Sequence, residues 1–245
     1  MSQYTTAANR INHKGTPTET SIFYSLAIQA LSVPHTSEIL REVDALVAWP
    51  GIVLDAAPRH AVLDWNNGIG KRHLLVAGYH EQDVAEEKFS LSKMEETLGL
   101  RRQHGVHTQI HAGHAGQQAT WVAEKVKELG ITSVALYIPS FHFLRGLLTT
   151  VESFRRLGIR IPIIPKTTPI SPFERSLLDA KSLVRDLCEM DVIHAEADPR
   201  MKSYQLKKES GSPGDVATVE VWEDYLRWLY DQPLLTSQLM KANQD

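Results

Sequence analysis

The sequence contains one cysteine, Cys188, among 245 residues. A single thiol cannot form a disulfide within the chain or build a thiolate metal cage. An excess of basic residues is missing as well, since the formal net charge is -3 at pH 7. The composition therefore gives no electrostatic reason to expect binding to nucleic acid or to an anionic membrane. It favours a protein whose ligand is a small molecule.

Long hydrophobic runs are also lacking. No stretch reaches the length that a bilayer-spanning helix needs, and residues 1–20 are polar, without the apolar core of a signal peptide. We therefore expect a cytoplasmic protein. Hydrophobic residues nevertheless make up 42% of the chain, which is ordinary for a globular protein with a well-formed core.

Two glycine-rich phosphate-binding motifs are absent. Residues 67–72, Asn-Gly-Ile-Gly-Lys-Arg, contain a Gly-Lys pair, but Trp65 stands where a P-loop requires glycine and Arg72 where it requires a hydroxyl. We interpret this segment as the end of a helix. After the first predicted strand only Gly51 is present, so the dinucleotide-binding fingerprint is missing and NAD binding has no support.

What the sequence does have is a regular alternation of short apolar runs and helical patterns from residue 44 onward. Strands that alternate with helices predict an α/β fold with a doubly wound, mostly parallel five-stranded sheet. The predicted strands are 45–49, 73–77, 106–111, 134–138 and 159–164, with 106–111 and 159–164 expected at edges. The predicted helices are 18–31, 37–43 (capped by Ser37), 58–66, 84–103 (broken near Gly99), 119–129, 140–157, 171–190 and 218–230.

These patterns divide the chain into three parts. Residues 1–43 form an N-terminal arm with helices, residues 44–165 form the α/β domain, and residues 166–245 form a helical C-terminal extension. The helix at 218–230 is rich in tryptophan and tyrosine. We favour packing of these aromatics against the sheet, with a homodimer face as the alternative.

The predicted organising element is the strand at 134–138 and the helix that follows it. Ser140 occupies the expected N-cap position, and His142 and Arg145 fall within the first turn. Helix N-termini attract anions through free N–H groups and the helix dipole. Anion or nucleotide binding is therefore our first interpretation, ahead of a capped helix with a buried histidine. Ser140 as a nucleophile activated by His142 is the least favoured reading.

A second strand-end loop runs from residue 111 to residue 118. Its glycines would let the backbone approach a ligand closely, and Gln117 and Gln118 could bind a sugar hydroxyl or a base edge. The alternative is a helix start with two solvated glutamines. Four histidines, at 104, 107, 111 and 114, cluster here, but no acidic residue lies among them. We therefore predict loop histidines and no metal site.

Residues 139–146, Pro-Ser-Phe-His-Phe-Leu-Arg-Gly, resemble the Ser-x-x-His-x-x-Arg turn of the YdcF/SanA/ElyC family. The His-x-x-Arg spacing is kept, whereas Ser140 stands one residue closer to the histidine. Residues 74–78, Leu-Leu-Val-Ala-Gly, are similar to the second strand of that family. Where the family has an Asn-Thr-x-Glu-Asn-Ala helix start, this chain has Gln117 in place of the glutamate.

The resemblance is nearest in type to the soluble YdcF-like members. It implies a Rossmann-like fold with a helical C-terminal part and S-adenosylmethionine as the cofactor. The expected function is binding of a nucleotide-like small molecule, as a transferase in specialised metabolism. A ligand sensor without catalysis and a hydrolase of phosphorylated or glycosylated envelope fragments are the alternatives. The expected catalytic residues are His142 and Ser140, and the expected cofactor-binding residues are Gly51, Gly78, His114, Gln117, Gln118, Ser140 and Arg145.

Overall fold

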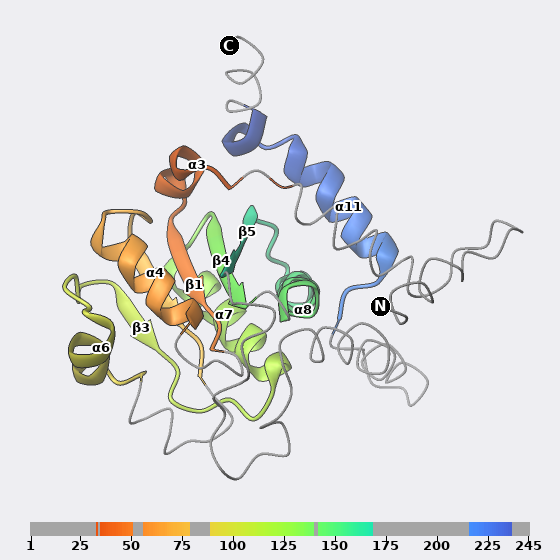
Figure 1. Ribbon diagram of the computed structural model, residues 1–245. Coiled ribbons are helices and arrows are strands. Elements are labelled where there is room, and N and C mark those ends of the chain that lie inside the picture. The colour runs from red at the N-terminus through yellow and green to blue at the C-terminus, as the bar shows by residue number, and fades with distance from the viewer. Residues whose placement is uncertain are drawn as a thin grey trace, which may run out of the picture.

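The protein has an α/β fold with one all-parallel sheet between helices (Figure 1), as the sequence predicts. The predicted helices at 18–31 and 171–190 lie outside the residues that can be described. The computed structural model describes residues 33, 35–50, 56–78, 89–139, 142–168 and 216–236.

The sheet has five strands in the spatial order β3-β2-β1-β4-β5. The chain moves outward from β1 to β3 and then returns to place β4 on the free side of β1, so the strand order reverses between β1 and β4. Leu46 in β1 pairs with Leu74 in β2 and with Ala135 in β4. The strands are β1 (Ala45–Ala48), β2 (His73–Val76), β3 (Val106–Thr108), β4 (Val134–Pro139) and β5 (Ile163–Thr168).

Burial explains the hydrophobic pattern of the central strands. Every residue of β1 and β4 is buried, so both faces of these strands are covered and no alternation of polar and apolar residues appears. All three residues of β3 are only half-buried. This is the edge position that the alternating pattern predicts.

Helices cover both faces of the sheet. Adjacent residues of β4 show the two sides: Tyr137 bonds to Asp64 of α4, whereas Ile138 lies beside Gly146 of α8. On the first side α4 (Ala56–Asn66) also contacts α6 (Leu91–Leu98). On the second side α7 (Ala115–Leu129) packs against α8 (Phe143–Arg156).

Helix α11 (Val219–Tyr230) packs on α8 and contacts the start of β5 through Tyr225. The Tyr225 hydroxyl accepts a hydrogen bond from the N–H of Ile163 (2.7 Å) and donates one to the carbonyl of Ile161 (3.0 Å). Trp222 and Tyr225 are buried, as the core-packing interpretation predicts. This part of the C-terminal extension therefore shares the core of the sheet domain.

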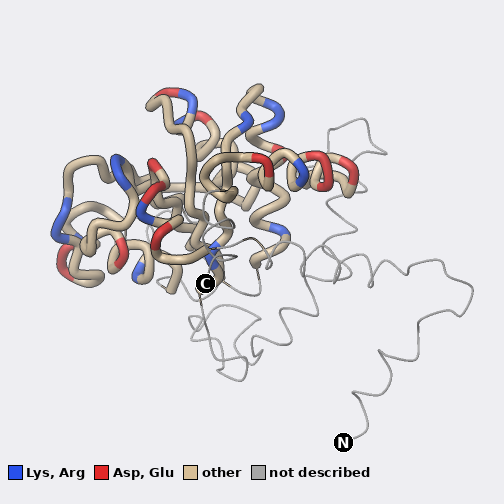
Figure 2. Tube along the Cα trace, turned by 90° about the horizontal axis from the view of Figure 1, so that it is seen from above, with Lys and Arg blue, Asp and Glu red and all other residues tan. Residues whose placement is uncertain are grey.

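Basic and acidic residues are interspersed along the described part of the chain (Figure 2). None of the described helices is both long enough and apolar enough to cross a membrane.

Several predicted boundaries are wrong for local reasons. Strand β5 begins at Ile163 instead of residue 159, because Gly158 closes α8 in a left-handed conformation (φ 68°) and residues 159–162 return the chain to the sheet. The short helix α3 (Ser37–Glu42) is capped by Thr36, not Ser37. By contrast, the predicted break near Gly99 is confirmed: α6 ends at Leu98, and Gly99 adopts φ 69°.

One buried polar cluster joins α4 to two strands. Asp64 of α4 accepts a hydrogen bond from the Tyr137 hydroxyl (2.6 Å) and forms an ion pair with Lys166 of β5. Burial, together with the Asp64 carboxylate, raises the pKa of Tyr137 well above its usual range, so the hydroxyl stays protonated and donates. The sequence alone does not indicate that these two charges meet, since Asp64 and Lys166 are 102 residues apart.

Replacement of Asp64 by alanine should destabilise the fold, because it leaves the buried Tyr137 hydroxyl and the mostly buried Lys166 ammonium without their acceptor. We expect a loss of about 2–4 kcal/mol in the free energy of unfolding, measured by urea denaturation. Asp224→Ala is the control, since it removes an exposed ion pair with Arg160 and should cost at most about 1 kcal/mol. Equal losses in the two variants would contradict this role.

Candidate functional site

The candidate site lies at the carboxyl ends of β1 and β4. In open parallel sheets the connections from two neighbouring strands diverge where the strand order reverses, and this opens a crevice outside their carboxyl ends. Trp49 follows β1 at this point and His142 follows β4. The predicted site residues Gly51 and Ser140 lie outside the described residues.

Helix α8 begins later than the sequence indicates. Its first helical residue is Phe143, and His142 is the N-cap, with helical backbone angles (φ -94°, ψ -5°) and no side-chain cap bond. The prediction that Ser140 caps this helix is therefore wrong. Strand β4 continues through Pro139, one residue past its predicted end.

The structure brings His142 and Arg145 together. A terminal nitrogen of the Arg145 guanidinium lies 2.7 Å from Nδ1 of His142. A guanidinium can only donate, so the imidazole accepts this hydrogen bond with Nδ1 unprotonated. Arg145 is 7% exposed, and His142 is half-buried. The guanidinium is thus held in place at the first turn of α8, as an anion-binding group must be.

Gly78 and Gln118 also meet, at the end of β2. The side-chain amide of Gln118 donates to the Gly78 carbonyl (2.5 Å), and the Gly78 N–H donates to Oε1 of Gln109 (3.0 Å). A Cβ at position 78 would lie 2.9 Å from the carbonyl oxygen of Gln109. Glycine is therefore needed here for close packing of the loop after β3.

His114 and Gln117 organise the start of α7. His114 is the N-cap and accepts from the N–H of Gly116 at Nδ1 (3.1 Å), while Oε1 of Gln117 accepts from the N–H of Gly113 (2.6 Å). The helix consequently begins at Ala115 and not at residue 119. Because α7 and α8 both start at the carboxyl edge and pack together, this loop lies on the same side of the sheet edge as the His142–Arg145 pair.

Sequence reasoning missed the part that Trp49 plays at this edge. Trp49 donates its backbone N–H to the carbonyl of Tyr137 (3.0 Å) and thereby extends the pairing of β1 with β4. Trp49 is 2% exposed, and its indole ring packs against Gly146 of α8. The signal was present in the sequence as a large aromatic residue at the end of a buried strand, but its neighbour lies almost a hundred positions away.

The other three histidines of the predicted cluster, at 104, 107 and 111, do not converge on a site within the described part of the chain. His104 and His111 are exposed, and Nε2 of His107 lies 3.3 Å from Nδ1 of His73. Among the described residues, no three His, Cys, Asp or Glu side chains are placed to share a metal ion.

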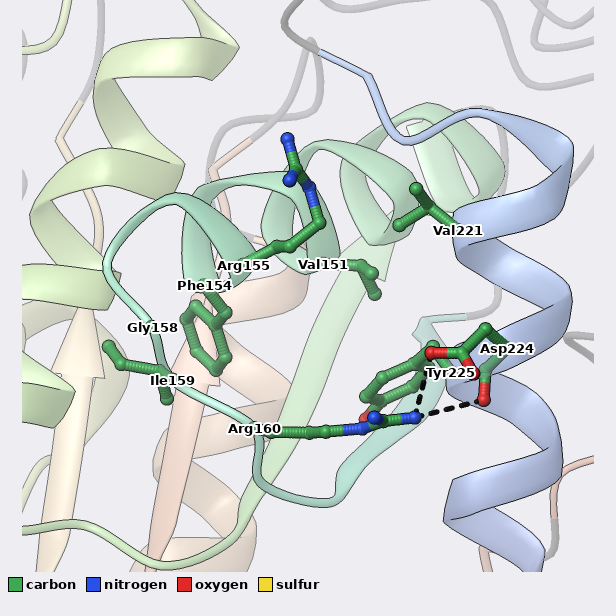
Figure 3. Close-up of a pocket in the computed structure, with 9 residues that line it drawn as sticks. All are labelled: Val151, Phe154, Arg155, Gly158, Ile159, Arg160, Val221, Asp224 and Tyr225. Atoms are coloured by element: carbon green, nitrogen blue, oxygen red, sulfur yellow. Dashed lines mark hydrogen bonds and ion pairs between the residues drawn. The ribbon is translucent and has the colours of Figure 1, made fainter.

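A cavity of about 260 Å³ lies at the opposite end of α8, between α8 and α11 (Figure 3). Val151, Phe154 and Val221 form apolar walls, and the Arg160–Asp224 ion pair (2.9 Å) lies along one side. None of the predicted site residues lines it. The sheet topology does not direct a ligand to this end of the helix, so we assign the greater weight to the carboxyl edge.

The His73–His107 pair should make stability depend on pH. Burial lowers the pKa of both imidazoles. The nearby charges of His107 and Arg72 lower the pKa of His73 further, and the charge of Lys125 does the same for His107. The unfolded chain then binds protons that the folded protein does not, so the free energy of unfolding should fall as pH drops below about 6.5. In urea denaturation between about pH 7.5 and about pH 5.5, His107→Gln should flatten this dependence. The exposed His111→Gln is the control, because this imidazole is not among the charges that act on His73 or His107, and it should change the dependence less; a matching effect there would refute the assignment.

Comparison of the chain with protein-family models, with curated proteins and with solved structures finds no match. The functional argument therefore depends on the geometry of the carboxyl edge.

Proposed function

We propose that this protein binds a nucleotide-like small molecule at the carboxyl edge of its sheet, with S-adenosylmethionine as the first ligand to test. One observation carries the proposal: the strand order reverses between β1 and β4, and α8 begins at that point. This is where open α/β sheets bind their ligands.

The groups at this point suit an anionic part of the ligand. The first turn of α8 points its N–H groups and the positive end of the helix dipole toward the edge, and the N-cap residue does not cap them with its side chain. The Arg145 guanidinium lies in the same turn, held by His142. Arg145 and the helix start would hold a carboxylate or a phosphate, and His142 would orient Arg145 or move a proton.

The described residues fit S-adenosylmethionine in two respects. Its amino-acid carboxylate matches the donors at α8. Its ribose matches the glutamines in the first turn of α7, which keep hydrogen-bonding capacity beyond their internal bonds: Oε1 of Gln118 can accept, and the amide nitrogen of Gln117 can donate. The resemblance to the YdcF-like family names this cofactor, which would supply an activated methyl group to a transferase.

A sensor without catalysis is the second candidate, and one observation favours it. Helix α8 begins at the proposed site and packs near its other end against α11 of the C-terminal extension. Ligand binding at the first turn could therefore shift the contact with α11 as a rigid element moves. The two candidates share the same binding site and differ only in turnover.

Calorimetric titration of the full chain with S-adenosylmethionine, S-adenosylhomocysteine and ATP tests the proposal. We expect saturable binding, weakened by at least about tenfold in Arg145→Met, because the substitution keeps an apolar stem and removes the charge-assisted hydrogen bonds. Arg160→Met, at the far end of α8, is the matched control and should bind normally. Thermal unfolding checks that both variants are folded.

Two results would count against the proposal. No heat from any of the ligands would mean that the edge does not bind them. Unchanged affinity in a folded Arg145→Met variant would mean that Arg145 does not hold the anionic part of the ligand. His142→Ala then separates the two candidates, since an enzyme should lose turnover while it still binds, and a sensor has no turnover to lose.

A further inference from the structure

Three buried side-chain atoms have no hydrogen-bond partner among the described residues: Nε1 of Trp49, Oγ1 of Thr168 and Nε1 of Trp222. A buried donor without an acceptor costs about 1–3 kcal/mol, which is why such groups are rare in folded proteins. Each of them therefore requires an explanation, either in local packing or in a partner that binds there.

Trp49 alone of these three lies at the point where the strand order reverses. It is the first residue after β1, and its backbone bond to Tyr137 places it directly beside β4. Trp222 belongs to α11, and Thr168 ends β5 at the edge of the sheet. Thr168 pairs in register with Pro139, which lies two residues beyond Tyr137 and so points to the same face of the sheet, the α4 side. Trp49 packs on the opposite face, the α8 side.

The orientation of the indole follows from its contact with α8. An ideal Cβ built on Gly146 would lie 3.3 Å from Cε3 and Cζ3 of Trp49, so the six-membered ring faces the helix backbone. Nε1 is on the opposite edge of an indole from these two carbons and is therefore turned away from Gly146. Gly146 directly follows Arg145, so Trp49 packs on the same turn of α8 that carries the guanidinium.

We propose that Trp49 is a ligand-binding residue, whose indole N–H donates a hydrogen bond to an oxygen atom of the anionic group held at the start of α8. This inference rests on the proposed function. An indole N–H can only donate, and the guanidinium and the helix N–H groups share that property, so the site selects a carboxylate or phosphate oxygen and disfavours an amine at that position. Phenylalanine at position 49 would keep most of the packing against Gly146 and lose the donor.

Nuclear magnetic resonance of the full chain labelled with 15N tests this directly. The protein has five tryptophans and hence five indole N–H resonances, of which Trp49→Phe removes one. Titration with S-adenosylmethionine, ATP and inorganic phosphate should move the Trp49 resonance downfield with any of these probes that binds. The affinity of Trp49→Phe for that probe should fall by about tenfold, as expected for one hydrogen bond to an anion.

Trp222→Phe is the matched control, because that indole is equally buried and equally unpartnered but belongs to α11. It should leave affinity unchanged. Binding by the wild type with a stationary Trp49 resonance and unchanged affinity in Trp49→Phe would overturn this inference and leave the proposed function standing. No binding of any probe to the wild type would overturn both. Should Trp49→Phe fail to fold, the wild-type resonance decides alone, since substitution of the other four tryptophans assigns it by exclusion.

Discussion

The structure depends on the burial of β1 and β4 on both faces. A strand whose side chains are apolar on both sides needs helices above and below the sheet, and parallel neighbours need crossover connections. Each right-handed crossover places its helix on a face that depends on which side of β1 the next strand is added. Helices therefore cover both faces only if strands are added first on one side of β1 and later on its other side. The reversal of strand order, and with it the edge at which we propose ligand binding, is therefore a consequence of how these two strands are buried.

Helix α8 connects the proposed site with the rest of the molecule. Its first turn carries Arg145 and contacts Trp49 through Gly146, and its last turns pack beside α11. The lack of a side chain at Gly146 brings the helix close to β1 and β4, because a Cβ there would press on both Trp49 and Ile138. The same close packing fixes the direction in which the N–H groups at the start of α8 point, and the proposed anion binding depends on that direction.

Uninterrupted apolar runs were sufficient to predict the central strands of the sheet, because a strand that is buried on both faces has apolar residues at successive positions. The ends of elements were harder to predict, because the apolar pattern marks neither the start of α8 at Phe143 nor the start of β5 at Ile163. Contacts between residues far apart in the sequence could not be predicted from it. Asp64 looks like an isolated charge until Lys166, 102 residues later, is placed against it. The pairing of His142 with Arg145 was within reach, since it depends only on helical spacing.

The long connection between β1 and β4 also governs how the chain acquires its fold. Asp44 and Ser133, which lie at the start of these two strands and share a hydrogen bond, are separated by 89 residues. During synthesis one side of β1 therefore stays open until most of the sheet domain has left the ribosome. Such a high contact order slows folding and exposes an unpaired apolar edge to other chains. The strand order that creates the proposed binding edge therefore also delays the pairing of β1 on its second side.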